Sequence, residues 1–475
     1  MPFVEFCCRS GGDNLNAGTL NGSSTEPSAS PVATYTGGDW NGSNIYTAPV
    51  GADLTEATAG RYVSICPDGS SVPVSNSYSI HMISSVNAGT RQITVRAVSS
   101  FYGAVAFGTV MASRTGNTTL RIGGAWLGPN GANIFPFTGM GWSMLSVYAG
   151  SVRVNLKNNQ TYNVTTTLTG SGWNVMGYST SYADGSRATI DGGTSGASYV
   201  LFTTNFGSGS VSGASIVADL IFQNNGATGS AGGVVIGSSV GYGVGANLVV
   251  KNMRGTGLSS TGYLFECESF SNVGYGISSA LAINCISHNN TGTGFGFTGR
   301  YVRCISHRNT SNGFYGNQNG SSLFCEECDA YLNGANGFYG ETVNNGSFFI
   351  RNSNAVQNSG RGILVASANG NANFGTTILN CGTFGNATGS IVFTGGVEQI
   401  LLNSGNVAYA ASPYVDAANG DFRISLAAAK NSGRGQFLQT ESGYTGTVGY
   451  PDIGAAQSAG GGGAIGGGNL NGGLQ

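Results

Sequence analysis

Between about residues 259 and 393, apolar and polar positions recur at constant offsets. Each repeat has a small residue, an asparagine five positions later, a bend residue at nine and an apolar residue at ten. The small-residue column is Cys267, Cys285, Cys304, Cys328, Ser353 and Cys381, and the asparagine column is Asn272, Asn290, Asn309, Asn333, Asn358 and Asn386. The bend column is Gly276, Gly294, Gly313, Gly337, Gly362 and Ser390, and the apolar column is Ile277, Phe295, Phe314, Phe338, Ile363 and Ile391.

Successive members of the small-residue column lie 18, 19, 24, 25 and 28 residues apart. Constant offsets within a repeat, with variable length elsewhere, are typical of a solenoid in which one corner is constant and one loop takes the insertions. We therefore predict an all-β chain whose main domain, residues 141–410, is a right-handed parallel β-helix. Three short strands from Val152 onward are expected to form its entry coil.

Each column has a physical reason. Cysteine behaves as a small apolar residue that points inward. Asparagine at a corner can adopt the left-handed conformation, bond the turn backbone and bond its equivalents in neighbouring coils. Glycine permits either a positive φ or close approach of another backbone. The cysteine and asparagine columns are therefore interpreted as a structural ladder.

A further column stands three positions after the cysteines, and we expect it to face the interior. Its members are Phe270, His288, His307, Tyr331, Val356 and Phe384. The adjacent histidines suggest either a metal or acid–base pair, or an aromatic stack along the axis. We favour the stack because a zinc site needs further ligands that the flanking positions do not supply. No metal or other cofactor is expected.

The first 140 residues lack this period. Residues 1–50, rich in Gly, Ser, Thr and Asn, are predicted to form an extended N-terminal arm. Residues 51–140 are predicted to form a small β-barrel or sandwich for attachment, which would also cover the entry coil. Its expected strands include 61–66, 79–84 and 92–97, with a hairpin turn at 87–89.

Composition narrows the function. The 475 residues include 81 glycines, only 8% are charged, and the net charge is −2. So sparse and balanced a charge provides no electrostatic footprint for nucleic acid, and no apolar run is long enough for membrane insertion. The N-terminus lacks the pattern of a secretory leader. The nine cysteines are interpreted mainly as buried, reduced thiols; Cys325 and Cys328 form a CxxC that nothing completes as a zinc site.

Candidate chemistry flanks the cysteine column. Arg303, Glu327 and Asp329 are expected on one face of adjacent coils, opposite the buried cysteines. A carboxylate pair there suits a polysaccharide hydrolase, whereas the alternative is a surface ion-pair patch of small energetic value. We favour the patch and assign no catalytic residue. Asp184 and Asp191 are interpreted as turn formers.

Two segments carry a family resemblance. Near the entry coil, Thr161-Tyr162-Asn163, Gly177-Tyr178 and Ile190-Asp191-Gly192-Gly193 follow in the order found in pectate-lyase-like proteins. After residue 400, Tyr414-Val415-Asp416, Asn419-Gly420-Asp421-Phe422-Arg423-Ile424 and Asp452-Ile453-Gly454-Ala455-Ala456-Gln457 resemble the closing segment of bacterial and phage β-helix proteins, which lacks its usual central motif here. This resemblance implies a C-terminal closing segment at 411–458 that caps the last coil. A Gly-rich tail, 459–475, follows.

These features favour a structural protein on the surface of a bacteriophage virion: a tail spike, a fibre or a capsid-decorating subunit that contacts host-surface glycans. Resemblance to phage spikes implies a homotrimer. The arm and the tail would bind other virion proteins. One alternative is a secreted polysaccharide lyase or glycoside hydrolase. The other is a bacterial surface adhesin or filament subunit, located extracellularly or at the cell surface.

Overall fold

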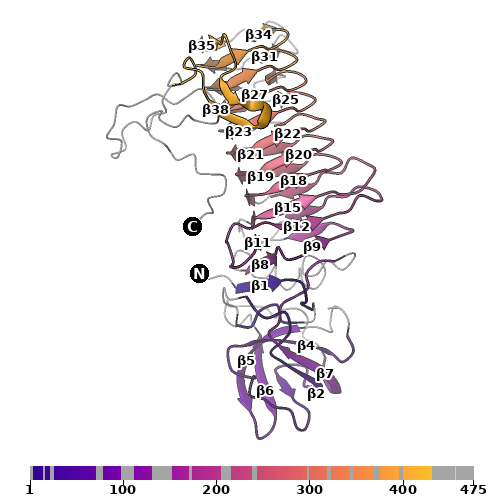
Figure 1. The fold of residues 1–475 in the computed structure, drawn as a ribbon. Helices are drawn as coiled ribbons and strands as arrows, with labels where there is room; N and C mark the ends of the chain where they lie inside the picture. The colour runs from indigo at the N-terminus through magenta and orange to yellow at the C-terminus, as the bar shows by residue number, and fades with distance from the viewer. Residues whose placement is uncertain are drawn as a thin grey trace, which may run out of the picture.

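The computed structural model shows an elongated all-β molecule (Figure 1). It describes residues 4–13, 16–21, 26–70, 79–97, 112–130, 152–170, 174–204, 215–237, 243–296, 299–317, 322–342, 347–367, 375–394, 400–430 and 455. A β-barrel stands at one end, and stacked coils of a parallel β-helix form the rest. No helix in these ranges has the length and hydropathy needed to cross a membrane.

The barrel is closed and antiparallel, with six strands in the described residues. The strands are β2 (Ala33–Trp40), β3 (Ile45–Thr47), β4 (Tyr62–Pro67), β5 (Ser79–Asn87), β6 (Gln92–Ala97) and β7 (Arg114–Ile122). The expected barrel or sandwich is therefore a barrel, but it begins before residue 51. Residues 131–140 of the expected domain lie outside the described ranges.

The expected N-terminal arm is wrong. β1 (Val4–Cys8) pairs in parallel with β8 (Val152–Lys157) and is the first strand of the solenoid, while β2 and β3 belong to the barrel. Periodicity could not reveal β1 as a strand of the solenoid, because a single strand has no repeat beside it in the sequence. Phe6 in β1 stacks on Trp126 with ring centroids 4.8 Å apart, and Tyr62 of the barrel meets the edge of the Phe6 ring. The barrel thus covers the entry coil, as expected.

Three parallel sheets form the sides of the solenoid. The long sheet has 15 strands among the described residues: β1, β8, β10 (Leu168–Gly170), β11 (Asn174–Tyr178), β13 (Phe202–Thr204), β14 (Ser215–Ala218), β16 (Val234–Ile236), β17 (Gly243–Ala246), β19 (Leu258–Phe265), β21 (Ile277–Ile283), β23 (Gly299–Val302), β26 (Leu323–Glu326), β29 (Phe348–Arg351), β32 (Thr376–Leu379) and β35 (Ile400–Ser404). The short sheet has four: β25 (Phe314–Asn317), β28 (Phe338–Thr342), β31 (Ile363–Ser367) and β34 (Ile391–Thr394).

The second sheet is the most regular. Its 11 strands in the described ranges are β9 (Thr161–Asn163), β12 (Ala188–Asp191), β15 (Leu220–Gln223), β18 (Val249–Lys251), β20 (Glu268–Phe270), β22 (Ile286–His288), β24 (Ile305–His307), β27 (Asp329–Tyr331), β30 (Asn354–Val356), β33 (Gly382–Phe384) and β36 (Val407–Ala408). The lengthening of successive coils falls between β25 and β26, β28 and β29, and β31 and β32. One loop position therefore takes the insertions, as the sequence predicted.

The asparagine ladder is continuous. From Asn272 to Asn386, each side-chain Nδ2 donates to Oδ1 of the next asparagine, over 2.8, 2.8, 3.1, 3.0 and 2.9 Å. The same Oδ1 atoms also accept the backbone N–H of the preceding asparagine. The asparagines do not adopt positive φ; the residue before each does, as at Ser271 and Asn289.

Of the two reasons expected for the glycine column, a positive φ or close approach of a neighbouring group, the structure shows close approach. A Cβ on Gly276 would lie 1.9 Å from the Ser287 hydroxyl, and one on Gly294 would lie 2.1 Å from Ser306. Those serine hydroxyls donate to glycine carbonyls across the interior, as in the 2.7 Å bond from Ser287 to Gly294. The cysteines of the ladder are fully or almost fully buried and all are free thiols.

The column containing the histidines stacks as expected but faces outward. Phe270, His288 and His307 have centroids 4.8 and 4.7 Å apart in nearly parallel planes. The interior position of each strand is instead the preceding small residue, such as Ser287, because alternate residues of a strand point to opposite faces. Burial, followed by the charges of His288 and Arg308, lowers the pKa of His307 to about 3, so this imidazole is neutral.

A C-terminal hairpin covers the upper part of this outer face. It is formed by β37 (Tyr414–Asp416), a 3₁₀ turn (Ala417–Asn419) and β38 (Asp421–Ile424). Phe422 packs against His307 and Tyr331 at centroid distances of 5.2 and 5.7 Å. The expected capping of the last coil is therefore wrong for this part: the hairpin lies against the flank of the coils (Figure 1), where it packs on apolar side chains. Residues 431–454 and 456–475, including the tail, lie outside the described residues.

Asp329 anchors the hairpin to the coils. It is fully buried, and its carboxyl oxygens accept hydrogen bonds from the Asn354 amide (3.0 Å), the Tyr414 hydroxyl (2.9 Å) and the backbone N–H of Ala455 (2.8 Å). Burial raises the pKa of this carboxyl to about 7, and those hydrogen bonds only partly offset it. The closing segment therefore depends on a carboxyl group that holds its proton well above the usual pH.

We predict that Asn309→Ala and Asn333→Ala each lower the free energy of unfolding by about 1–3 kcal/mol, because each leaves buried amides without partners inside the stack. Denaturant melts measure this, with the exposed Asn419→Ala as the matched control. If the melts of both ladder variants coincide with that of the parent, the stabilisation attributed to the asparagine ladder is contradicted.

We expect Cys285, Cys304 and Cys328 to be reduced and unreactive in the native protein, because all three are fully buried in one column. Exclusion of the reagent by burial, not the thiol pKa, protects all three: burial raises the pKa of Cys304 and that of Cys381 (to about 12), whereas hydrogen bonds with neighbouring thiols outweigh burial and lower the pKa of Cys285 and Cys328. Thiol titration should show little labelling before denaturation and full labelling after it. Rapid native labelling of the three would refute this assignment.

The raised pKa of Asp329 predicts a pH dependence. Between about pH 4 and 7 the native state holds a proton that the unfolded chain releases, so the stability contributed by Asp329 falls as pH rises and levels off above about pH 7. Between pH 4.5 and 8, we expect the parent to lose a few kcal/mol of unfolding free energy relative to the Asp329→Asn variant, which cannot titrate at this position. Denaturant melts across this range measure it, and a difference that is independent of pH would exclude a titrating Asp329.

Candidate functional site

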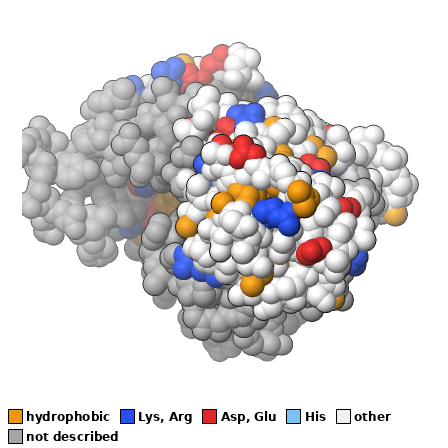
Figure 2. Space-filling view, turned by 90° about the horizontal axis from the view of Figure 1, so that it is seen from below, with side chains coloured by type: hydrophobic (Ala, Val, Ile, Leu, Met, Phe, Trp, Pro, Cys, Tyr) orange, Lys and Arg blue, Asp and Glu red, His pale blue; other side chains and the backbone are white. Residues whose placement is uncertain are grey.

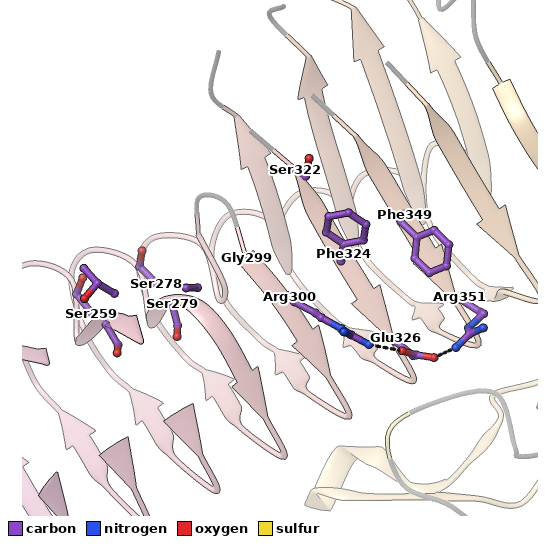
Figure 3. A pocket seen from close by; sticks show the side chains of 13 residues that line it. Ser259, Ser278, Ser279, Gly299, Arg300, Ser322, Phe324, Glu326, Phe349 and Arg351 are labelled. Carbon is purple, nitrogen blue, oxygen red and sulfur yellow. Dashed lines mark hydrogen bonds and ion pairs between the residues drawn. The ribbon is translucent and has the colours of Figure 1, made fainter. Parts of the chain in front are cut away.

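A groove of about 880 Å³ lies on the flank of the solenoid, beside the position where successive coils take insertions. Residues from five neighbouring strands of the long sheet, together with Ser322 of one inserted loop, line it (Figure 3). The lining residues are Ser259, Ser260, Thr261, Ser278, Ser279, Ala280, Gly299, Arg300, Ser322, Phe324, Glu326, Phe349 and Arg351. At about 4.8 Å per strand, the groove runs roughly 19 Å along the axis.

Strand alternation points the functional side chains outward. Tyr301, Cys325 and Ile350 are fully buried in the core, so their neighbours on the same strands face the groove. Register then sets adjacent pairs: Arg300 lies opposite Phe324, Phe324 opposite Phe349, and Glu326 opposite Arg351. The result is an aromatic row beside a charged row (Figure 3).

The charged row is a carboxylate held between two guanidinium groups. Glu326 Oε2 lies 3.4 Å from Arg300 Nη2, and Glu326 Oε1 pairs with Arg351 Nη2. Glu326 is only 4% exposed, whereas the Arg300 side chain is 60% exposed. The three charged residues that line the groove therefore leave one net positive charge, and it is carried on its solvent side by Arg300.

The aromatic row is formed by Phe324 and Phe349, whose ring centroids are 5.9 Å apart at 37°. Phe324 is 37% exposed, so part of its ring is open to solvent in the groove. The guanidinium of Arg351 lies 5.9 Å from the Phe349 ring and supports it. Serine hydroxyls of β19 and β21 line the other end. The groove thus combines ring faces, hydrogen-bonding groups and one available cation.

The structure brings together two of the three residues predicted from the sequence. Arg303 Nε and Glu327 Oε2 lie 3.7 Å apart, which confirms an ion pair. Both residues have positive φ, 52° and 51°, so they occupy turns and not a strand. The expected shared strand face is therefore wrong, because a left-handed residue ends the alternation. Burial raises the pKa of Glu327, and Arg303 counteracts this only in part.

Asp329 lies elsewhere. It begins β27 and is buried beneath the C-terminal hairpin, so the expected exposed carboxylate pair with Glu327 is wrong. Among the described residues, Asp329 is 0% exposed and bonded to Tyr414 and Ala455, which does not suit a group that must meet a substrate. Asp184 is a turn former, as interpreted: its carboxylate accepts backbone N–H bonds from Ser179, Thr180, Ser181 and Ser186, which lower its pKa. Asp191 likewise accepts the N–H of Gly193 at 2.7 Å.

Sequence reasoning missed the groove residues themselves. Arg300 and Phe324 stand four positions before a column cysteine, and Glu326 stands two before one. Phe349 and Arg351 hold the same offsets from Ser353. The strand alternation upstream of the column was the available signal. In the described residues, no group of three or more His, Cys, Asp or Glu side chains is arranged to hold a metal ion.

Comparison with known proteins finds distant structural likenesses only. No family model matches the chain, and no curated protein matches it significantly. Among solved structures, the pectate lyase Pel9A is similar over 70% of this chain and 96% of its own, at 16% identity and a TM-score of 0.42. The periplasmic alginate epimerase AlgG is similar over 54% of this chain and 76% of its own, at 10% identity and a TM-score of 0.33.

A phage protein is similar to the same degree. The Dettilon tailspike protein covers 59% of this chain and 59% of its own, at 13% identity and a TM-score of 0.37. Enzymes and a tailspike are therefore both among the structures that this chain resembles distantly, and likenesses at these levels do not choose between them. The all-β architecture, a parallel β-helix with a small N-terminal barrel, is established by the structure of the chain itself.

Proposed function

We propose that this chain is a structural protein of a bacteriophage virion surface, a tail spike, fibre or capsid decoration, that contacts host-surface glycans through the flank groove. The observation that carries the glycan contact is the row of Phe324 and Phe349 beside hydroxyl and guanidinium groups. Exposed ring faces stack on the apolar faces of sugars, while polar groups bind their hydroxyls. The resemblance of the closing segment to phage β-helix proteins supports the virion location.

The separation of the barrel from the groove also supports a role in presenting the groove on a virion surface. The barrel stands at one end (Figure 1) and the groove is lined by strands of the long sheet on the side, so attachment and binding can occupy separate surfaces. Figure 2 shows the barrel end, where neutral polar side chains and backbone predominate among the described atoms and charged groups are scattered. Such a surface offers no concentrated positive field for nucleic acid. Attachment to another virion protein suits it better.

A secreted polysaccharide lyase or hydrolase is the second candidate, and the fold alone allows it. Glycoside hydrolysis ordinarily needs two carboxyl groups on either side of the bond. Glu326 is the single carboxylate among the described lining residues and is already paired with two arginines. This chemistry favours binding over cleavage. An adhesin or filament subunit would use the same groove, and neighbouring capsid or tail genes would distinguish the phage protein from it.

The oligomeric state belongs to the proposal as well. The expected use of residues 1–50 as a free arm no longer supports assembly, because β1, β2 and β3 fold within the protein. Trimerisation now rests on the resemblance to phage spikes, which commonly pack three β-helices side by side. Binding of virion partners by the tail, 459–475, is kept as part of the same proposal.

We predict that the purified chain binds bacterial surface polysaccharide without cleaving it. Glycan arrays measure the binding, and assays for new reducing ends and for unsaturated uronates measure cleavage. Phe324→Ala should weaken binding about tenfold or more, since burying the apolar face of a sugar on the Phe324 ring contributes on the order of 1.5 kcal/mol. The exposed Val415→Ala is the matched control outside the groove. Products that accumulate with the parent but not with Glu326→Gln would favour the enzyme.

We also expect a trimer in solution. Light scattering should give about three times the chain mass of 48.1 kDa at micromolar concentration. Truncation after residue 458 tests whether the tail is needed for assembly. A monodisperse monomer would remove the trimer from the proposal and increase the weight of the secreted enzyme.

A further inference from the structure

We propose that the groove selects acidic glycans, with a sugar carboxylate bound by Arg300 and the ring that carries it stacked on Phe324. This inference rests on the proposed glycan binding and names the class of glycan that this groove takes. It concerns one site only, the surface formed by β23, β26 and β29 (Figure 3).

Charge is the first argument. Arg300, Glu326 and Arg351 are the charged groups among the described lining residues, and they sum to one positive charge. Only 8% of the residues of the chain are charged, so two arginines at one groove are a concentration of cationic groups. Guanidinium groups bind carboxylates through a rigid fork of N–H donors, which gives both energy and direction. A neutral glycan would leave this surplus charge unused.

Exposure assigns the two arginines different roles. Arg351 is 16% exposed, pairs with buried Glu326 and lies against Phe349, so its position is already determined by contacts within the protein. Arg300 is 60% exposed and approaches Glu326 only at 3.4 Å. Most of its donors therefore face solvent. Glu326 acts as a positioning residue that holds the Arg300 guanidinium over the groove without neutralising both arginines.

Register supplies the geometry of recognition. Arg300 is the cross-strand neighbour of Phe324, and the Cβ atoms of such neighbours lie about 5 Å apart. A sugar ring stacked on Phe324 thus brings a carboxylate substituent within reach of the Arg300 side chain. Phe349, opposite Phe324 on the next strand, continues the platform for an adjoining ring. The serines of β19 and β21 offer hydroxyls at the opposite end of the groove, on the other side of Arg300.

The experiment uses the full chain and an array of bacterial capsular and O-antigen polysaccharides. Each acidic polysaccharide is paired with its carboxyl-reduced derivative, so that only the charge differs. Affinities are compared for the parent, Arg300→Gln, Arg300→Lys and Arg423→Gln. Arg423 is the matched control, because it is 69% exposed and pairs with Asp421 in β38, outside the groove. Circular dichroism melts check that each variant folds like the parent.

We expect the parent to bind at least one acidic polysaccharide about tenfold or more tightly than its reduced partner. Arg300→Gln should remove that preference, Arg300→Lys should retain part of it, and Arg423→Gln should leave it unchanged. The preference should also weaken as salt rises, because Arg300 is exposed. Equal binding of acidic and reduced partners, or an unaffected Arg300→Gln variant, would overturn the inference while leaving glycan binding intact. Absence of binding to every polysaccharide would instead overturn the proposed function.

Discussion

The hydrogen bond from one asparagine amide to the asparagine of the next coil is the interaction on which the rest of the fold depends. A solenoid coil must turn sharply, and the turn leaves backbone amides inside a protein with no water to bind them. From Asn290 to Asn386, every Oδ1 accepts both a backbone N–H and a side-chain N–H from the preceding coil, and Asn272 Oδ1 accepts the backbone N–H of Met253. Each asparagine thus satisfies its neighbour, and the coils must stack in register for any of them to do so.

That constraint determines where the protein can vary. The corner bearing the asparagine admits no insertion, since Gly276 and its equivalents already touch the neighbouring serine and asparagine side chains. The additional residues of the longer coils enter between the short and long sheets, away from the asparagine column. The groove begins beside those insertions. A rigid ladder on one side and a permissive loop position on the other are therefore what place a binding surface on the flank.

Two buried carboxyl groups, those of Asp329 and Glu326, lie in electrostatically different surroundings. Asp329 is sealed under the hairpin among neutral hydrogen-bond donors, and the loss of water raises its pKa to about 7. Glu326 is shielded instead by Arg300 and Arg351 on an open sheet surface. The first group fastens the closing segment to the coils. The second organises a cationic surface that remains accessible, so the chain separates a structural carboxyl from one suited to a binding site.

The repeating parts of this protein could be predicted from the amino-acid pattern alone, because equivalent positions of a solenoid recur at fixed offsets in the sequence. The ladder, the stacked histidines, the insertion position and the presence of an N-terminal β domain all followed from local patterns. Which face the His288 column takes, the place of β1 and the position of the hairpin on the flank were decided by tertiary structure. Each depends on contacts between segments far apart in the chain, such as Tyr414 with Asp329, for which no period exists. The groove was decided in the same way, since Arg300, Glu326 and Arg351 meet only after three coils have stacked in register.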